Sequence, residues 1–169
     1  MKSLAIQEKF GRMEGMAAAL GNLGLIYDTR GDLDQAEEMH EKSLAIHEKL
    51  GQKEGMAITY GNIGIIYKKR GEVGRAEEMI KKALAIAEKL GQQEVMAIQY
   101  SNLSLVAKAR GDLDDARALW TKARDLYAKI GMPHMVNQVQ GWLDDLPKPA
   151  AKSKRASGKH GKSKTKKKK

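Results

Sequence analysis

The sequence contains no cysteine, only three prolines and a single phenylalanine among its 169 residues. Without cysteine it can form no disulfide, no thiolate metal site and no cysteine nucleophile. No run approaches the roughly 18 apolar residues that would predict a transmembrane helix. The first 20 residues include Lys2, Glu8 and Arg12 and lack an apolar core, which argues against a secretory signal. We therefore expect a soluble cytoplasmic protein.

Acidic residues are absent from the end of the chain. Residues 147–169 contain 11 lysines and arginines and no aspartate or glutamate. Basic and acidic residues nearly cancel over the rest of the sequence, so the formal net charge of +10 comes almost entirely from this tail. The tail has no large apolar side chain with which to build a core. We expect residues 147–169 to be a disordered, lysine-rich tail.

Two interpretations of this tail remain open. It could attach to nucleic acid, ribosomes or another polyanion, or it could be a solubilising or incidental segment. Phosphate contacts release counterions, so tail-driven binding would weaken steeply with salt. The tail has no aromatic residue to stack on bases, which argues against sequence-specific reading. The candidate polyanion-binding residues are Lys152, Lys154, Arg155, Lys159, Lys162, Lys164, Lys166, Lys167, Lys168 and Lys169.

The rest of the sequence repeats itself every 40 residues. Residues 11–50 and 51–90 are identical at 23 of 40 positions, and residues 91–130 continue the pattern. A fixed period of this length indicates a solenoid, a propeller or another repeat array. The glycines carry the period most clearly, in two series: Gly11, Gly51, Gly91 and Gly131, and Gly31, Gly71 and Gly111.

Each period predicts two helices, which we call helix A and helix B. Apolar residues at spacings of three and four over 14–30, such as Leu20, Leu23 and Tyr27, are typical of one helix face. Gly31 then predicts a helix stop, and Asp32 a helix N-cap. Strand-like alternation is absent, so the fold class is all-α. The pattern places helix A at about 14–30, 54–70 and 94–110, and helix B at about 33–50, 73–90 and 113–130.

Both ends of the array look incomplete. Residues 1–10 align with residues 41–50, which predicts a partial helix B that Gly11 terminates. Residues 131–146 predict a terminal capping helix, with Pro133 in its first turn and Trp142 near its end. The predicted array therefore covers residues 1–146. Its open N-terminal end is a candidate site for self-association.

Small and aromatic residues recur at fixed positions of the repeats. They are Leu23, Gly24, Tyr27, Ala36 and Ser43 in the first repeat, and Ile63, Gly64, Tyr67, Ala76 and Ala83 in the second. This signature resembles that of the tetratricopeptide repeat family. The 40-residue period is similar to its long-helix subclass, found in kinesin light chains, Pins/LGN-type polarity scaffolds and bacterial regulators. The resemblance implies a right-handed α-solenoid of helix-turn-helix units in which small residues let helices A and B approach closely. In the third repeat the signature residues are Leu103, Ser104, Ala107, Ala116 and Ala123, so the aromatic residue is lost there.

The resemblance also implies a concave groove lined by helices A. An asparagine side chain carries both a donor and an acceptor, so a row of asparagines could hold a peptide main chain of any sequence. Alternatively, these asparagines could be relics of duplication or could bond neighbouring A helices. The candidate groove residues are Asn22, Asn62, Asn102, Leu25, Ile65, Leu105, Lys68, Lys69 and Lys108.

We therefore expect a protein–protein interaction scaffold that binds a peptide segment of a partner in its groove. The alternative is an RNA- or ribosome-associated protein attached through its basic tail. No metalloprotease, phosphate-loop, nucleophile-elbow or dinucleotide motif is present, so we expect no enzymatic activity, no cofactor and no metal. His40 and His47 occupy packing positions of helix B. The Arg30-Gly31-Asp32 tripeptide falls at a helix boundary and is interpreted as a turn.

Overall fold

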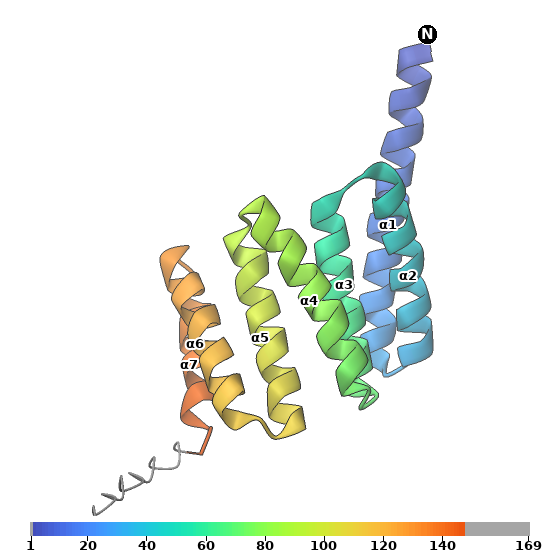
Figure 1. Cartoon of the computed structure of the whole chain (residues 1–169). Helices are drawn as coiled ribbons and strands as arrows, with labels where there is room; N and C mark the ends of the chain where they lie inside the picture. Colours follow the sequence, from blue (N-terminus) through green and yellow to red (C-terminus); the bar gives the residue numbers. More distant parts are fainter. Residues whose placement is uncertain (1, 148–169) are drawn as a thin grey trace, which may run out of the picture.

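The computed structural model describes residues 2–147, with side chains from residue 9 onward. These described residues form seven helices and no strand. Consecutive helices pack against one another in a row from α1 to α7 (Figure 1), so the predicted all-α solenoid is confirmed. The helices are α1 (Lys2–Arg30), α2 (Leu33–Leu50), α3 (Lys53–Lys69), α4 (Val73–Leu90), α5 (Gln93–Arg110), α6 (Leu113–Lys129) and α7 (Pro133–Asp144).

Every turn between these helices contains a glycine with positive φ. At Gly31 φ is 85°, a conformation that residues with a Cβ rarely adopt. The backbone N–H of Asp32 donates to the carbonyl of Tyr27 (3.0 Å), and that of Gly31 to the carbonyl of Asp28 (3.1 Å), which satisfies the last carbonyls of α1. Asp32 occupies the N-cap position of α2, but its side chain makes no capping hydrogen bond. Its ψ of 67° lies outside the extended conformation usual for a capping residue.

Helices A and B approach closely where the sequence has small residues. A Cβ added at Gly64 would lie 2.5 Å from Cγ1 of Ile80 and 3.1 Å from the carbonyl oxygen of Ala76. A Cβ at Gly24 would lie 2.6 Å from Nε2 of His40. Because these glycines have no side chain, His40 of α2 packs directly against the backbone of α1. Ile80 of α4 packs against the backbone of α3 in the same way. The predicted role of the two glycines is confirmed.

The N-terminal end differs from the expectation. Residues 2–30 form one continuous helix, so Gly11 does not end a separate helix B over residues 1–10. Gly11 lacks the positive φ of the turn glycines, and a Cβ there would meet nothing within 4 Å. No described helix packs on the outer side of α1, so a turn at Gly11 would bury little surface and would break helical hydrogen bonds. The first turns of α1 extend past the neighbouring helices in Figure 1.

The C-terminal end carries the largest core cluster. Trp120, Tyr127, Val139 and Leu143 are buried there, and the rings of Trp120 and Trp142 lie 5.8 Å apart. Pro133 occupies the first turn of α7, as the sequence predicts.

The boundary of the predicted tail falls at the edge of the described chain. The carbonyl of Pro147 accepts a hydrogen bond from the Arg117 guanidinium (2.7 Å), so this first tail residue is tied to α6. The remaining predicted tail, residues 148–169, lies outside the described residues. Among the helices that the structure describes, none combines the length and apolarity needed to cross a bilayer.

Replacing Gly64 by alanine should destabilise the array, because the new methyl would overlap Ile80 and the Ala76 backbone. Overpacking of this kind costs about 1–3 kcal/mol. The matched control is Gly15→Ala, at an exposed position inside α1 where a Cβ meets nothing. It should stabilise by about 0.5–1 kcal/mol because alanine favours helix. Urea unfolding followed by circular dichroism measures both; equal stability of the two variants would contradict the close approach.

Candidate functional site

A hollow of about 760 Å³ lies between the first two repeats, and we call it the groove. Among the predicted site residues, Asn22 and Leu25 of α1 and Asn62 of α3 line it. Ile58 of α3 adds a second aliphatic side chain to its wall. Leu25 and Ile58 are 48% and 47% exposed, although large aliphatic residues are usually buried. The groove therefore combines carboxamides with exposed aliphatic surface from two adjacent A helices.

One wall of the groove comes from helix B and from the turn that follows it. The Nδ1 of His47 donates a hydrogen bond to Oε1 of Gln52 (2.8 Å). The Nε2 of Gln52 in turn donates to the carboxylate of Glu14 (2.5 Å). A Cβ at Gly55 would lie 2.3 Å from Nδ1 of His47, so this glycine leaves room for the imidazole. His47 is predicted from the sequence to be a packing residue, and that prediction misses its place in this wall. The available signal was that Gln52 recurs as Gln92, directly after a turn glycine.

The third repeat does not contribute its predicted residues to the groove. The amide of Asn102 donates to Oε1 of Gln99 within α5 (3.3 Å), which is a bond inside one helix rather than between A helices. Leu105 packs against the C-terminal core cluster. Ile65 and Lys68 are half-buried, and neither lines the groove.

Two predicted groove lysines have partners of their own. The ammonium of Lys69 lies 2.7 Å from both carboxylate oxygens of Asp28, so it links α3 to α1. The ammonium of Lys108 lies 5.8 Å from the centre of the Trp120 ring, within cation–π range. The structure therefore brings together Asn22, Asn62 and Leu25, and it places the lysines outside the groove.

His40 lies beneath the groove and is only 1% exposed. Neither ring nitrogen has a hydrogen-bond partner. Burial lowers the pKa of His40 below its ordinary value, with the Asp28 carboxylate acting weakly in the opposite direction. The equivalent residues Ile80 and Trp120 are buried as well, which confirms the packing interpretation. His40 is therefore a neutral core side chain near neutral pH.

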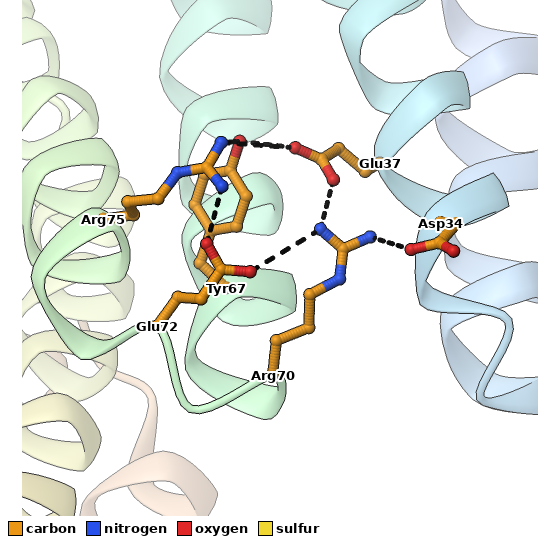
Figure 2. Close-up of polar contacts among 6 residues, drawn as sticks. All are labelled: Asp34, Glu37, Tyr67, Arg70, Glu72 and Arg75. Atoms are coloured by element: carbon orange, nitrogen blue, oxygen red, sulfur yellow. Dashed lines mark hydrogen bonds and ion pairs between the residues drawn. The ribbon is translucent and has the colours of Figure 1, made fainter.

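A second polar cluster joins the first and second repeats. It lies where the C-terminal end of α3 meets the first turns of α2 and α4. Glu37 of α2 accepts hydrogen bonds from the Tyr67 hydroxyl and from Arg70, and the Arg75 guanidinium donates to the Tyr67 oxygen (2.7 Å). The Arg75 guanidinium also lies 3.9 Å from the centre of the Tyr67 ring. Figure 2 shows the whole set, which we call the clamp: Asp34, Glu37, Tyr67, Arg70, Glu72 and Arg75.

The protonation states in the clamp favour a structural role. Burial, and then the hydrogen bond to Glu37, raise the pKa of Tyr67 to about 12. Burial alone would raise the pKa of Glu37, but the hydrogen bonds from Tyr67 and Arg70 outweigh it and keep that pKa below its ordinary value. An acid–base catalyst needs a pKa near the working pH. Both shifts lead away from that range, so the clamp holds fixed hydrogen bonds between repeats. Within the described part of the chain, no cluster of three histidine, aspartate or glutamate residues could hold a metal ion.

Replacing His40 by isoleucine, the residue of the second repeat, should reduce the sensitivity of the fold to acid. Below about pH 6.5 an unfolded histidine takes up a proton, whereas folded His40 resists it because its pKa is lowered. The contribution of neutral His40 to folding stability is therefore fully present above about pH 6.5 and is lost progressively as the pH falls below it. Melting temperatures at pH 7.5 and 5.5 measure this loss. His134→Gln, at an exposed site on α7, is the control for removing a histidine. An unchanged acid loss in His40→Ile would contradict the prediction.

Comparison with known proteins agrees with this geometry. A tetratricopeptide repeat family model matches residues 2–89, and a second matches residues 99–120. No curated protein sequence matches the chain.

Solved structures share the fold at low sequence identity. The N-terminal domain of stress-induced protein-1 from C. elegans has 16% identity and a TM-score of 0.57, covering 76% of this chain and 95% of that one. BtubC from P. vanneervenii has 20% identity and a TM-score of 0.58, covering 81% and 68%. TPR-like repeats described as a kinesin light chain, from Podosopora anserina, have 21% identity and a TM-score of 0.54, covering 76% and 68%. The described residues form helix pairs joined by glycine turns, and a family model spans more than half of the chain, so the chain belongs to the tetratricopeptide repeat family.

Proposed function

We propose that this chain is an interaction scaffold that binds an extended peptide segment of a partner protein in the groove. Tetratricopeptide repeats generally mediate protein–protein interactions. The observation that carries the proposal is that Asn22 and Asn62, from adjacent repeats, line one hollow together with Leu25 and Ile58. The third repeat contributes Gln92 to this hollow but not its asparagine, because Asn102 is bonded within its own helix.

The chemistry of the groove suits a peptide main chain. Each asparagine carboxamide can donate to a peptide carbonyl and accept from a peptide N–H, which needs no particular ligand sequence. Leu25 and Ile58 are nearly half exposed, so an apolar ligand side chain would remove their surface from water. The expected ligand is therefore an extended segment with an apolar residue at the level of these two side chains.

The basic tail supports a second candidate function, attachment to nucleic acid or another polyanion. Its support is compositional: 11 basic residues and no acidic residue in residues 147–169. This candidate and the groove proposal differ in their salt dependence. Binding through many phosphate contacts collapses between about 50 and 200 mM salt, whereas contacts in a partly apolar groove persist.

Replacing both Asn22 and Asn62 by alanine should weaken peptide binding at least about tenfold, the equivalent of one or two lost hydrogen bonds. Peptides are first selected from a displayed library on the full-length chain at about 200 mM salt, where tail-driven binding is suppressed. Their affinities are then measured by fluorescence anisotropy. Asn137→Ala, at an exposed site on α7 away from the groove, is the matched control.

The stability of the same variants separates a groove role from a structural one. Surface substitutions without packing consequences change stability by less than about 0.5 kcal/mol. A large loss of melting temperature in the double variant would indicate structural asparagines and would contradict the groove proposal. Selected peptides that bind the double variant as tightly as the wild type would also contradict it.

We also propose that the outer face of α1 lets the chain associate with a second copy. Leu23 and Ile26 are 42% and 47% exposed, whereas their equivalents Ile63 and Ile66 in α3 are 3% and 1% exposed. The same apolar pattern is thus buried against a neighbouring repeat in α3 and left uncovered in α1. An apolar face of this kind is typical of a contact surface.

The variant Leu23→Glu should abolish that association, because it places a charge in the apolar face. Sedimentation velocity over a range of protein concentrations measures the oligomeric state. Ile98→Glu, which also replaces an exposed aliphatic residue by a charge but lies on α5, is the control. A wild-type chain that stays monomeric at all concentrations would refute the self-association proposal.

A further inference from the structure

The outer side of α1 carries four residues that we call the outer stripe: Met16, Ala19, Leu23 and Ile26. Spacings of three and four residues place all of them on one face of the helix. All four are exposed. α2 packs on the other side of α1, where Gly24 meets His40. The first turns of α1 extend past the neighbouring helices (Figure 1), so a further helix could lie along the outer stripe.

The matching face of α3 shows how such a stripe is covered inside the array. Thr59, Ile63 and Ile66, which stand 40 residues after Ala19, Leu23 and Ile26, are all buried. Leu44 of α2 packs against the core cluster that contains Ile63. The surface that receives a neighbouring helix in α3 is therefore present in α1 without that helix.

A recess lies beside the outer stripe at Gly15. Its equivalent in α3, Gly55, leaves room for His47 of α2, because a Cβ there would lie 2.3 Å from Nδ1 of the imidazole. A Cβ at Gly15 would meet nothing within 4 Å. The outer side of α1 thus combines bulky apolar side chains with small residues, and a helix packed on it could approach closely at Gly15 and Ala19.

The opposite end of the array offers no apolar surface to match. The large exposed hydrophobic residues of the described chain include none on α6 or α7. The exposed side of α7 carries polar residues such as Asn137, Gln138 and Asp144, while Val139 and Leu143 are buried in the core. A head-to-tail contact would lay the outer stripe on this polar side. Contact between two outer stripes buries apolar surface on both copies and closes the association at a dimer.

We propose that two copies of the chain pair their α1 helices antiparallel, about a twofold axis at Ala19. This inference specifies the self-association proposed above and rests on it. Ala19 is the smallest residue of the outer stripe, so two crossing helices can approach most closely there. In this register Leu23 of each copy lies level with Gly15 of the other, which sets a bulky side chain against a recess.

The charges on α1 fit the same register. Arg30 of each copy lies level with Glu8 of the other, and the spacing of both residues places them on the face of the outer stripe. The twofold axis gives two such pairs of opposite charge, one at each end of the contact. A parallel pair in register would instead set each charge beside its own copy.

The pairing leaves the groove of each copy open. Asn22 and Leu25 line the groove and lie roughly 100° around α1 from the outer stripe, given 3.6 residues per helical turn. A dimer therefore presents two grooves, and peptide binding and self-association do not compete for the same face.

A single cysteine tests the position of the axis. Because the chain contains no cysteine, Ala19→Cys introduces one thiol per copy. Two thiols form a disulfide when their Cα atoms lie within about 4.4–6.8 Å, which the axis at Ala19 provides. Mild oxidation, at concentrations where sedimentation velocity shows association, should give a linked dimer on a non-reducing gel. Adding Leu23→Glu should remove that product. The control Ala128→Cys, exposed on α6, should give none.

A charge exchange tests the register independently. Arg30→Glu should weaken the dimer about three- to tenfold, because it sets two pairs of like charges against each other. Glu8→Arg in the same chain reverses both charges and should restore the affinity. The dissociation constants come from sedimentation velocity over a range of protein concentrations.

The outcomes distinguish this pairing from self-association in general. A wild-type chain that stays monomeric would refute both. Association that Leu23→Glu abolishes, but with no linked dimer from Ala19→Cys and no rescue by Glu8→Arg, would overturn the antiparallel pairing alone. A linked product between Ala19→Cys and Gln138→Cys chains would indicate head-to-tail contact and would overturn it as well.

Discussion

The close approach of helix A to helix B at small residues is the constraint on which the rest of the structure depends. Gly64 lets Ile80 of α4 sit against the backbone of α3, and Gly24 does the same for His40 of α2. A helix pair of this size buries too little surface to be stable alone, so each pair must present a face that its neighbour can cover. Tight pairs make that face narrow and regular. The regularity allows Tyr67 of one repeat to reach Glu37 of the previous one.

Most of the fold could be predicted from the sequence, because its determinants are local and recur. The turn glycines were identifiable, since a positive φ at Gly31 or Gly51 suits no other residue as well. The continuous helix through Gly11 could not be predicted from the alignment of residues 1–10 with residues 41–50. Gly11 has the helical backbone of α1, and no described helix packs on the outer side of α1, so a turn there would gain little packing.

The candidate site was predictable only in part, for a related reason. Helix periodicity gives the direction of a side chain. It predicts that Asn22, Leu25 and Asn62 face the same side, and all three line one hollow in the structure. Periodicity does not show which neighbouring group a polar side chain will bind. The hydrogen bond of Asn102 to Gln99 and the ion pair of Lys69 with Asp28 were therefore missed. The wall from His47 and Gln52 was missed because it depends on how the turn folds back beside Gly55.

The clamp also sets the joint between the first and second repeats apart from the next joint. Between the first and second repeats, a buried tyrosine, two arginines and their carboxylate partners oppose any change in the angle between neighbouring pairs. Between the second and third repeats, the corresponding contacts centre on Arg110, with Glu77 at 2.8 Å and Asp115 at 3.8 Å, and Ala107 stands in place of the tyrosine. The two joints of the solenoid are thus held by different sets of polar contacts. The relative placement of Asn22 on α1 and Asn62 on α3 therefore depends on the contacts that the clamp makes across the first joint.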